Sequence, residues 1–198
     1  MRPDRRANPA YVEAFARVVA KVASRLKDVD PKLLPIRLYV AGGAALYLRT
    51  GSRVSVDIDG VFSRRVVIDD DLEASYRDPD GRARVLYLDR NYNDTLGLLH
   101  EDAHKASERV DLPGNDGKVL DVRVLTPLDL AVSKLARFSD QDRADIELLA
   151  REKLVDAKSL RKRAQEALGG YVGDVTSVRS SIELACALVE AARKGAAP

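Results

Sequence analysis

Hydrophobic positions recur at helical spacing near the N-terminal end of the chain. The repeating apolar positions there are Val12, Phe15, Val19, Val22 and Leu26. Asn8 and Pro9 directly precede them, and this pair is typical of an N-cap followed by a proline in the first turn. The pattern therefore predicts a helix that begins at Asn8-Pro9 and presents one apolar face.

Apolar runs and alternating positions in the middle of the chain predict strands. Residues 36–40 and 85–88 are short apolar runs, and 119–125 alternates between apolar and polar positions. The turn signal Asn115-Asp116-Gly117 separates 119–125 from 109–112, and this arrangement is typical of a β-hairpin. Residues 30–126 are therefore expected to form a mixed α/β core.

The C-terminal third carries helix-start signals. Thr126 precedes Pro127, and Ser139 precedes Asp142 by three positions, as in helices capped at the N-terminus. Apolar residues then recur at helical spacing through 176–193. We expect two parts, an α/β core with an N-terminal helix over 1–126 and a helical region over 127–198.

Composition limits the class of protein. The chain has 198 residues, a net charge of +2 and a single cysteine, Cys186. The charge gives no global signal for polyanion binding, and one cysteine allows no intrachain disulfide. No apolar run is long enough to span a bilayer, and the first residues lack an apolar signal core. We expect a cytoplasmic protein without a membrane partner.

The stretch 40–61 carries the clearest chemistry. A predicted strand leads into Gly42-Gly43 and a short helical pattern, and Asp57 and Asp59 follow on a second predicted strand. Glycines allow close backbone approach to an anion, and N–H groups that open a helix point toward it. Residues two apart on a strand share a face, so the two carboxylates repel unless a cation lies between them. Alternatively, Gly42-Gly43 forms only a turn, and Asp57 and Asp59 lie on a solvated strand face.

The spacing of these residues resembles the polymerase-β-like nucleotidyltransferase superfamily. The resemblance rests on Gly42-Gly43 followed after thirteen residues by Asp57-Ile58-Asp59. Arg53, Ser55 and Asp57 are similar to the R-x-S-x-D motif of its toxin branch, which includes the AbiEii-like and MenT-type toxins of type IV toxin–antitoxin systems.

A second stretch resembles the same toxin branch. It runs L-T-P-L-D-L-A-V-S-K-L-A-R and continues, after four residues, as D-R-A-D-I. The resemblance implies that Lys134 and a downstream acid complete the active site, and the spacing leaves Asp142 and Asp145 equally eligible. Arg137 follows Lys134 on an adjoining face of the predicted helix and is a candidate for substrate binding. Alternatively, Lys134 is a solvated charge and Asp142 a capping residue.

The resemblance implies a reaction and a site. The reaction is transfer of a nucleoside monophosphate (NMP) from a nucleoside triphosphate (NTP) to an acceptor hydroxyl, expected at the 3′ end of a tRNA, in a toxin that has a cognate antitoxin protein. Mg²⁺ is the expected cofactor, held by Asp57 and Asp59. The expected phosphate contacts come from Gly42, Gly43, Arg53, Ser55, Lys134 and Arg137. A third metal carboxylate is expected on a strand beside Asp57 and Asp59, where Asp121 is the candidate. Pairing with Arg123 is an equal alternative for Asp121.

Two other functions stay open. His100-Glu101-Asp102-Ala103-His104 matches the H-E-x-x-H pattern, in which two histidines one helical turn apart bind zinc and the glutamate acts as base. A zinc hydrolase is therefore an alternative, although a third ligand would have to be a carboxylate. The second open function is that of a catalytically inactive relative that serves as a binding or regulatory module. The basic segment 158–163 is either an RNA-binding surface or a solvated helix face.

Overall fold

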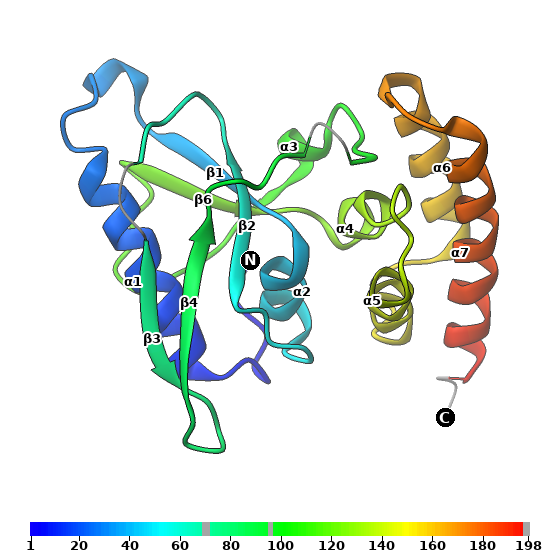
Figure 1. Cartoon of the computed structure of the whole chain (residues 1–198), viewed down its shortest axis with the longest axis horizontal. Coiled ribbons are helices and arrows are strands. Elements are labelled where there is room, and N and C mark those ends of the chain that lie inside the picture. Colours follow the sequence, from blue (N-terminus) through cyan, green and yellow to red (C-terminus); the bar gives the residue numbers. More distant parts are fainter. Residues whose placement is uncertain (69–71, 95–96, 196–198) are drawn as a thin grey trace. The chain divides into compact units, whose positions relative to one another are not determined.

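The computed structural model describes residues 1–68, 72–94 and 97–195, which form a mixed α/β protein (Figure 1). The chain divides into two compact units. Unit 1 comprises Met1–Tyr92 and Ser107–Val124, and unit 2 comprises Asn93–Ala106 and Leu125–Pro198. Segment 93–106 thus joins the C-terminal helices, whereas the sequence analysis places it with the core.

Unit 1 is built on a mixed sheet. Within the described residues six strands pair in the order β3-β4-β2-β1-β6-β5. Their bounds are Ile36–Val40 (β1), Asp57–Phe62 (β2), Glu73–Arg77 (β3), Ala83–Asp89 (β4), Glu108–Arg109 (β5) and Leu120–Val124 (β6). Strand β1 pairs antiparallel with β2 and parallel with β6, while β2 pairs parallel with β4. The antiparallel pairing of β5 with β6 confirms the hairpin predicted around Asn115-Asp116-Gly117, although β5 covers only Glu108–Arg109 and not the predicted 109–112.

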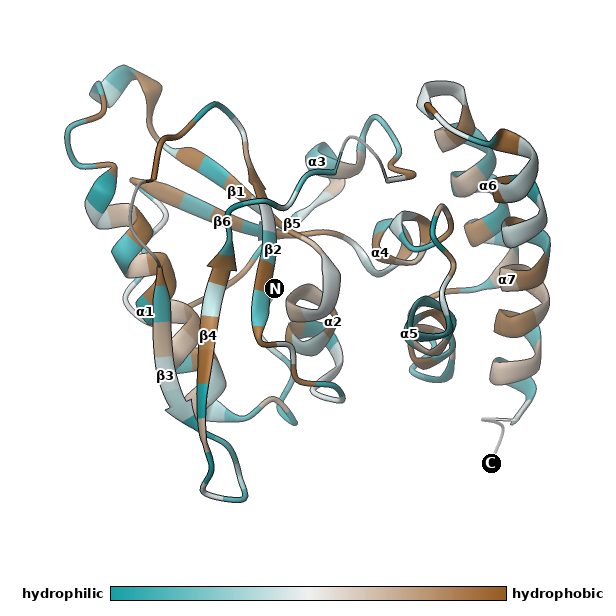
Figure 2. Cartoon of the chain, viewed as in Figure 1, coloured by the Kyte–Doolittle hydropathy of each residue, from teal (hydrophilic) through white to brown (hydrophobic). Residues whose placement is uncertain are grey.

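One face of this sheet is apolar and buried. Alternate positions on its strands point into the core, as the changes of hydropathy along β1 and β6 show in Figure 2. The buried positions are Leu38, Val40, Ile58, Tyr76, Leu86, Leu88, Leu120, Val122 and Val124.

Helices α1 (Pro9–Arg25) and α2 (Gly42–Thr50) pack on the buried face. Tyr11 of α1 makes edge-on contacts with Tyr47 of α2 and Tyr76 of β3, at centroid distances of 4.6 and 5.5 Å. As predicted, α1 begins after Asn8, whose side chain accepts a hydrogen bond from the Ala10 N–H. The polar positions of the strands consequently lie on the opposite face of the sheet.

The segment directly before β2 alternates between apolar and polar residues, as a strand would, but β2 begins only at Asp57. Val54 and Val56 are 44% and 49% exposed, while Ser55 between them is buried. The Val56 carbonyl already accepts a hydrogen bond from the Tyr87 N–H of β4 at 3.1 Å, so pairing with β4 begins there, but the valine side chains face solvent and the Ser55 side chain turns inward.

Unit 2 is helical. Its helices are Ala103–Ala106 (α3), Pro127–Ser133 (α4), Asp140–Arg151 (α5), Ala157–Ala167 (α6) and Val175–Gly195 (α7). The predicted starts at Thr126 and Ser139 are confirmed, since each side chain accepts a hydrogen bond from the backbone N–H three residues on. Helix α4 is shorter than predicted, because Lys134 is its C-cap and Arg137 follows its end. Among the described residues, no helix combines the length and apolar character that a bilayer span requires.

Candidate functional site

The turn between β1 and α2 brings Gly42 against Asp59. Gly42 has a φ of +58°, which side chains rarely adopt, and a Cβ built there would lie 1.7 Å from Asp59 Oδ2. The backbone closes the same turn, since the Ala41 N–H donates to the Asp59 carbonyl at 2.9 Å. Only glycine therefore allows the start of α2 to lie directly against this carboxylate.

Gly43 makes the corresponding approach to the residues that precede β2. A Cβ at Gly43 would lie 2.7 Å from Ser55 Oγ and 3.7 Å from an Arg53 guanidinium nitrogen. Ala41, the N-cap of α2, makes no side-chain cap hydrogen bond. The structure thus brings together five residues that the sequence analysis singles out, with two glycines on one side and Arg53, Ser55 and Asp59 on the other.

The paired carboxylates lie where the spacing predicts. Asp57 and Asp59 occupy positions one and three of β2 and share the polar face of the sheet, each partly exposed. The Ser55 hydroxyl donates a hydrogen bond to Asp57 Oδ1 at 2.5 Å. This bond fixes the orientation of the Asp57 side chain.

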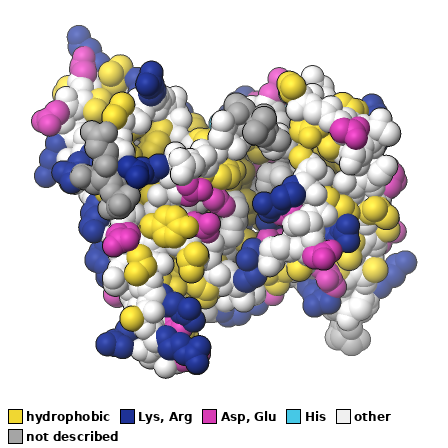
Figure 3. All heavy atoms as spheres, in the orientation of Figure 1, with side chains coloured by type: hydrophobic (Ala, Val, Ile, Leu, Met, Phe, Trp, Pro, Cys, Tyr) yellow, Lys and Arg dark blue, Asp and Glu magenta, His cyan; other side chains and the backbone are white. Residues whose placement is uncertain are grey.

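Strand β4 adds a third carboxylate that the sequence analysis does not single out. In the parallel pairing of β2 with β4, Asp59 lies opposite Asp89 and Asp57 lies opposite Tyr87. Residues opposite one another in a ladder project on the same face, so Asp89 lies beside Asp59. Figure 3 shows acidic side chains gathered over the region of β2 and β4. The position of Asp89 directly after the predicted strand 85–88 is the signal that could have identified it.

Asp121 lies elsewhere in the sheet. It belongs to β6, and β1 separates β6 from β2. The expectation that Asp121 occupies a strand beside Asp57 and Asp59 is therefore wrong, because strand order depends on long-range pairing that spacing does not reveal. Its carboxylate faces three arginines, and Arg123 donates to it at 3.3 Å. The alternative pairing with Arg123 is the one observed.

The donor set on β2 suits a hard cation. Mg²⁺ prefers oxygen ligands and is usually held by one or two carboxylates together with substrate phosphates. Asp57 and Asp59 supply two carboxylates on one face, and Asp89 lies next to them. In the part of the chain that the structure describes, no group of three His, Cys, Asp or Glu residues forms a ready-made metal cage. The residues fit a metal that completes its coordination with substrate and water.

A second charged cluster lies within unit 2. The Lys134 ammonium donates to Asp145 Oδ2 at 2.5 Å and lies 3.7 Å from Asp142 Oδ1. All three side chains are buried, with exposed fractions of 7% for Lys134 and 1% for each aspartate. Gln141 donates to the other Asp145 oxygen at 3.0 Å. The structure thereby distinguishes the two aspartates that the sequence left equally eligible, because Asp145 is the direct partner of Lys134.

Asp142 has a different set of partners. Its carboxylate accepts two hydrogen bonds from the Arg137 guanidinium, both at 2.8 Å, and two from the backbone N–H and hydroxyl of Ser139. Burial by itself raises the pKa of Asp142, but these hydrogen bonds and the Lys134 charge outweigh burial and lower the pKa to about 2. Asp142 therefore caps α5 and holds Arg137, whose side chain is 75% exposed.

The histidine motif does not form the helix that zinc binding requires. Helix α3 begins only at Ala103, so His100 precedes it. His104 Nε2 lies 3.0 Å from Asp94, while His100 Nε2 lies 3.6 Å from Glu166 and His100 Nδ1 accepts from the Asp102 N–H. The two histidines turn to different carboxylates, which gives no support to the zinc hypothesis.

The basic segment of α6 is largely paired within unit 2. Arg161 forms an ion pair with Glu183, and Lys162 lies 3.9 Å from Glu166. Arg163 binds the buried Asp129 through two hydrogen bonds of 2.8 and 3.2 Å. These contacts favour the interpretation of 158–163 as a structural helix face.

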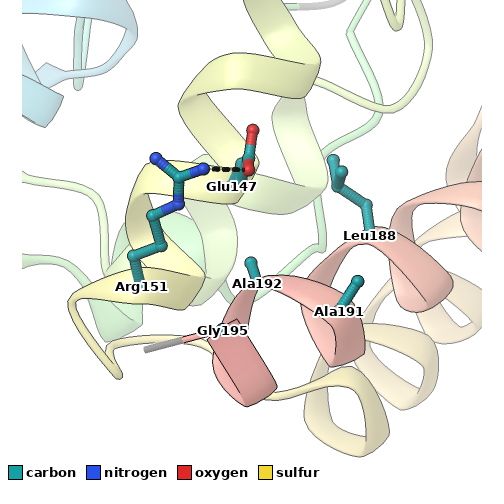
Figure 4. Close-up of a pocket in the computed structure, with 6 residues that line it drawn as sticks. All are labelled: Glu147, Arg151, Leu188, Ala191, Ala192 and Gly195. Atoms are coloured by element: carbon teal, nitrogen blue, oxygen red, sulfur yellow. Dashed lines mark hydrogen bonds and ion pairs between the residues drawn. The ribbon is translucent and has the colours of Figure 1, made fainter. Parts of the chain in front are cut away.

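A cavity of about 500 Å³ lies between α5 and α7, apart from these clusters (Figure 4). Its lining residues are Glu147, Arg151, Leu188, Ala191, Ala192 and Gly195. The two charged residues among them pair with each other, as Figure 4 shows. The cavity offers small apolar side chains and none of the predicted site residues.

Comparison with known proteins shows the family of this chain. A family model described as "Nucleotidyltransferase of unknown function (DUF6036)" matches residues 17–180. No curated protein and no solved structure shows a significant match. The matched span includes both the carboxylates of β2 and the Lys134 cluster, and its description names a reaction class without an acceptor or a biological role.

Proposed function

This chain belongs to a family of nucleotidyltransferases of unknown function, and on that premise we propose that it transfers an NMP from an NTP to an acceptor hydroxyl. The acceptor hydroxyl loses its proton to water as its oxygen bonds to the α-phosphorus, the bond from that phosphorus to the oxygen that bridges to the β-phosphate breaks, and pyrophosphate leaves with the electron pair. The observation that carries the proposal is the close approach of Gly42 and Gly43 to Asp59, Ser55 and Arg53.

Each residue of this group has a role that follows from its position. Asp57 and Asp59 would hold Mg²⁺, which lowers the charge on the phosphates and stabilises the developing charge of the transfer. Ser55 keeps Asp57 oriented through its 2.5 Å hydrogen bond. Gly42 and Gly43 leave room for phosphate oxygens near the first N–H groups of α2, and Arg53 lies beside Gly43 to pair with them.

Unit 2 supplies further charged groups under this proposal. Lys134 neutralises charge on the leaving pyrophosphate, for which a compact ammonium is suited. Asp145 orients Lys134, because it is the direct partner at 2.5 Å. Asp142 holds Arg137 through a bidentate pair, and the exposed Arg137 guanidinium contacts substrate phosphate. Asp145 is thus assigned to the lysine and Asp142 to the arginine.

The acceptor and the biological role follow from the resemblance to the toxin branch. We propose that the acceptor is the 3′ end of a tRNA, that the protein acts in the cytoplasm as a growth-inhibiting toxin, and that a cognate antitoxin protein restrains it. Support comes from the two motifs, around Asp57 and around Lys134, which occur in the same order as in that branch.

A direct assay tests the reaction. The purified full chain is incubated with each α-labelled NTP and total RNA, with Mg²⁺ or with a chelator, and the label is followed in RNA and in protein. We expect Mg²⁺-dependent transfer of label from one preferred NTP to small RNA, and none by the Asp57→Asn variant. Absence of transfer with all four nucleotides would refute the proposal, and label in protein alone would refute the RNA acceptor.

A further inference from the structure

Three arginines of unit 1 converge on Asp121. Arg37 of β1 lies 3.7 Å from Asp121 Oδ2, Arg123 of β6 lies 3.3 Å from the same oxygen, and Arg109 of β5 lies 3.9 Å from Oδ1. Asp121 itself is 9% exposed. Three guanidinium groups thus share one carboxylate, which leaves this arginine cluster with an excess of positive charge.

Two members of the arginine cluster keep their donors available. Arg123 is committed to the fold, since it donates to the Ser107 hydroxyl at 3.0 Å and to the Ser107 carbonyl. The side chains of Arg37 and Arg109 are 54% and 50% exposed. Within the described residues neither guanidinium makes a hydrogen bond, and Asp121 Oδ1 is buried without a hydrogen-bond partner.

Each neighbouring acid pairs with a cation outside the arginine cluster. Glu108 lies 3.6 Å from Arg49, and Asp116 lies 3.4 Å from Lys118, although its charge also interacts with Arg109. Asp111 lies 3.7 Å from Arg2. Because each of these carboxylates has another cation at hand, Arg37 and Arg109 remain suited to an external anion.

The arginine cluster and the β2 carboxylates share one face of the sheet. In the ladder Arg37 lies opposite Asp121, and Tyr39 lies opposite both Arg123 and Val61. Val61 alternates with Asp59 and Asp57 on β2, so all these side chains project on the polar face. Asp59 and Asp121 are two strands apart, at ~4.8 Å per strand, and four residues apart along the strand direction, at ~3.3 Å per residue. These perpendicular displacements combine to a separation of about 16 Å.

We propose that the arginine cluster binds the phosphodiester backbone of the acceptor strand. Guanidinium forks match phosphate oxygens in a bidentate geometry, and the Asp121 carboxylate holds the arginines together against their mutual repulsion. The separation exceeds the reach of about 10 Å that one triphosphate held at β2 would have. A polynucleotide chain is long enough to contact both places. That the bound strand is the acceptor rests on the proposed function.

The test measures binding rather than turnover. A fluorescein-labelled single-stranded RNA oligonucleotide is titrated with the full chain at several salt concentrations, in the Asp57→Asn background, and its anisotropy is followed. The double variant Arg37→Ala/Arg109→Ala should raise Kd about tenfold and reduce the slope of log K against log salt by about 1.4, since each single-strand phosphate contributes about 0.7. The same titration with DNA of the same sequence distinguishes RNA from DNA as the strand.

Two variants serve as controls. Arg82→Ala, at the exposed turn between β3 and β4, removes one charge from unit 1 and should change neither Kd nor slope. The double variant Arg37→Lys/Arg109→Lys keeps both charges, so it should retain the slope, but it should lose part of the affinity because an ammonium cannot make the bidentate contact. This partial loss tests the proposal even if the alanine variant fails to fold.

The possible results decide the proposal clearly. Unchanged affinity and slope in the alanine variant, for RNA and DNA alike, would overturn it, as would a wild-type chain that binds neither. A weakened affinity for a non-hydrolysable NTP would overturn it too, because the arginine cluster would then serve the donor nucleotide. If strand binding depends on the arginines but no transfer occurs, the proposed function fails while the binding site stands.

Discussion

The Lys134 ammonium lies 2.5 Å from the Asp145 carboxylate, and this buried ion pair ties the end of α4 to α5. Lys134→Ala should lower the free energy of unfolding by about 3 kcal/mol, because it leaves a buried carboxylate without its cation. Asp145→Ala should cost a similar amount. The double variant Lys134→Met/Asp145→Leu should cost clearly less than the sum, as urea denaturation can measure. Additive effects would show that the pair does not couple the two helices.

The lowered pKa of Asp142 makes stability depend on pH. Its folded-state pKa of about 2 lies below the ordinary value of 3.8, so the ionised form stabilises the fold above pH 4 and the contribution is lost as pH falls toward 2. Asp142→Asn should remove about 2 kcal/mol of this pH-dependent stability. The control is Asp140→Asn in the same helical turn, where the side chain is 99% exposed. Identical pH profiles for wild type and Asp142→Asn would contradict the assignment.

Gly42 should tolerate no side chain. Gly42→Ala introduces a strained φ, at a cost of about 1 kcal/mol, and a clash with Asp59 that adds about 1–3 kcal/mol and displaces the carboxylate. Gly81→Ala is the matched control, because Gly81 also has a positive φ but has no atom within 4 Å of the added Cβ. The thermal midpoint and the rate of nucleotide transfer should both fall further in Gly42→Ala than in Gly81→Ala. Equal effects at the two glycines would show that the approach to Asp59 is unimportant.

Removing one charge from the β2 pair should separate activity from stability. Asp57→Asn keeps an oxygen that can accept from Ser55 but lowers the negative charge beside Asp59. Transfer should fall at least about a hundredfold, because metal binding is lost. Without Mg²⁺ the thermal midpoint should equal or exceed that of wild type, since repulsion is relieved. Asp80→Asn, at an exposed turn, serves as the control; a variant Asp57→Asn that transfers nucleotide normally would refute the metal assignment.

The toxin role predicts an effect on growing cells. Expression of the wild-type chain alone should arrest bacterial growth, and both Asp57→Asn and Lys134→Ala should relieve the arrest. Because Lys134→Ala also removes a buried ion pair, its amount of folded protein must be compared with wild type by immunoblot of the soluble fraction. Unimpeded growth at high wild-type expression in several hosts would contradict the toxin role and leave the transfer reaction untouched.

Local signals in the sequence predict the starts of the helices well. Asn8 before Pro9, Thr126 before Pro127 and Ser139 before Asp142 each depend on hydrogen bonds that span two or three residues. Such bonds involve only neighbouring residues, so no distant contact is needed to predict them. The approach of the Gly42-Gly43 turn to β2 is predictable for a similar reason, since thirteen residues join the glycines to Asp57.

Pairing between distant segments decided the strand order and the choice of ion-pair partners. The sequence alone determined that Asp57 and Asp59 share a strand face, but only the sheet decided that β4 with Asp89 lies beside them while β6 with Asp121 lies beyond β1. Periodicity likewise placed Asp142 and Asp145 on one side of α5, whereas the chain between α4 and α5 decided that Lys134 meets Asp145. Periodicity describes which way side chains point along one element, while strand order and the choice of ion-pair partner depend on packing between elements far apart in the sequence.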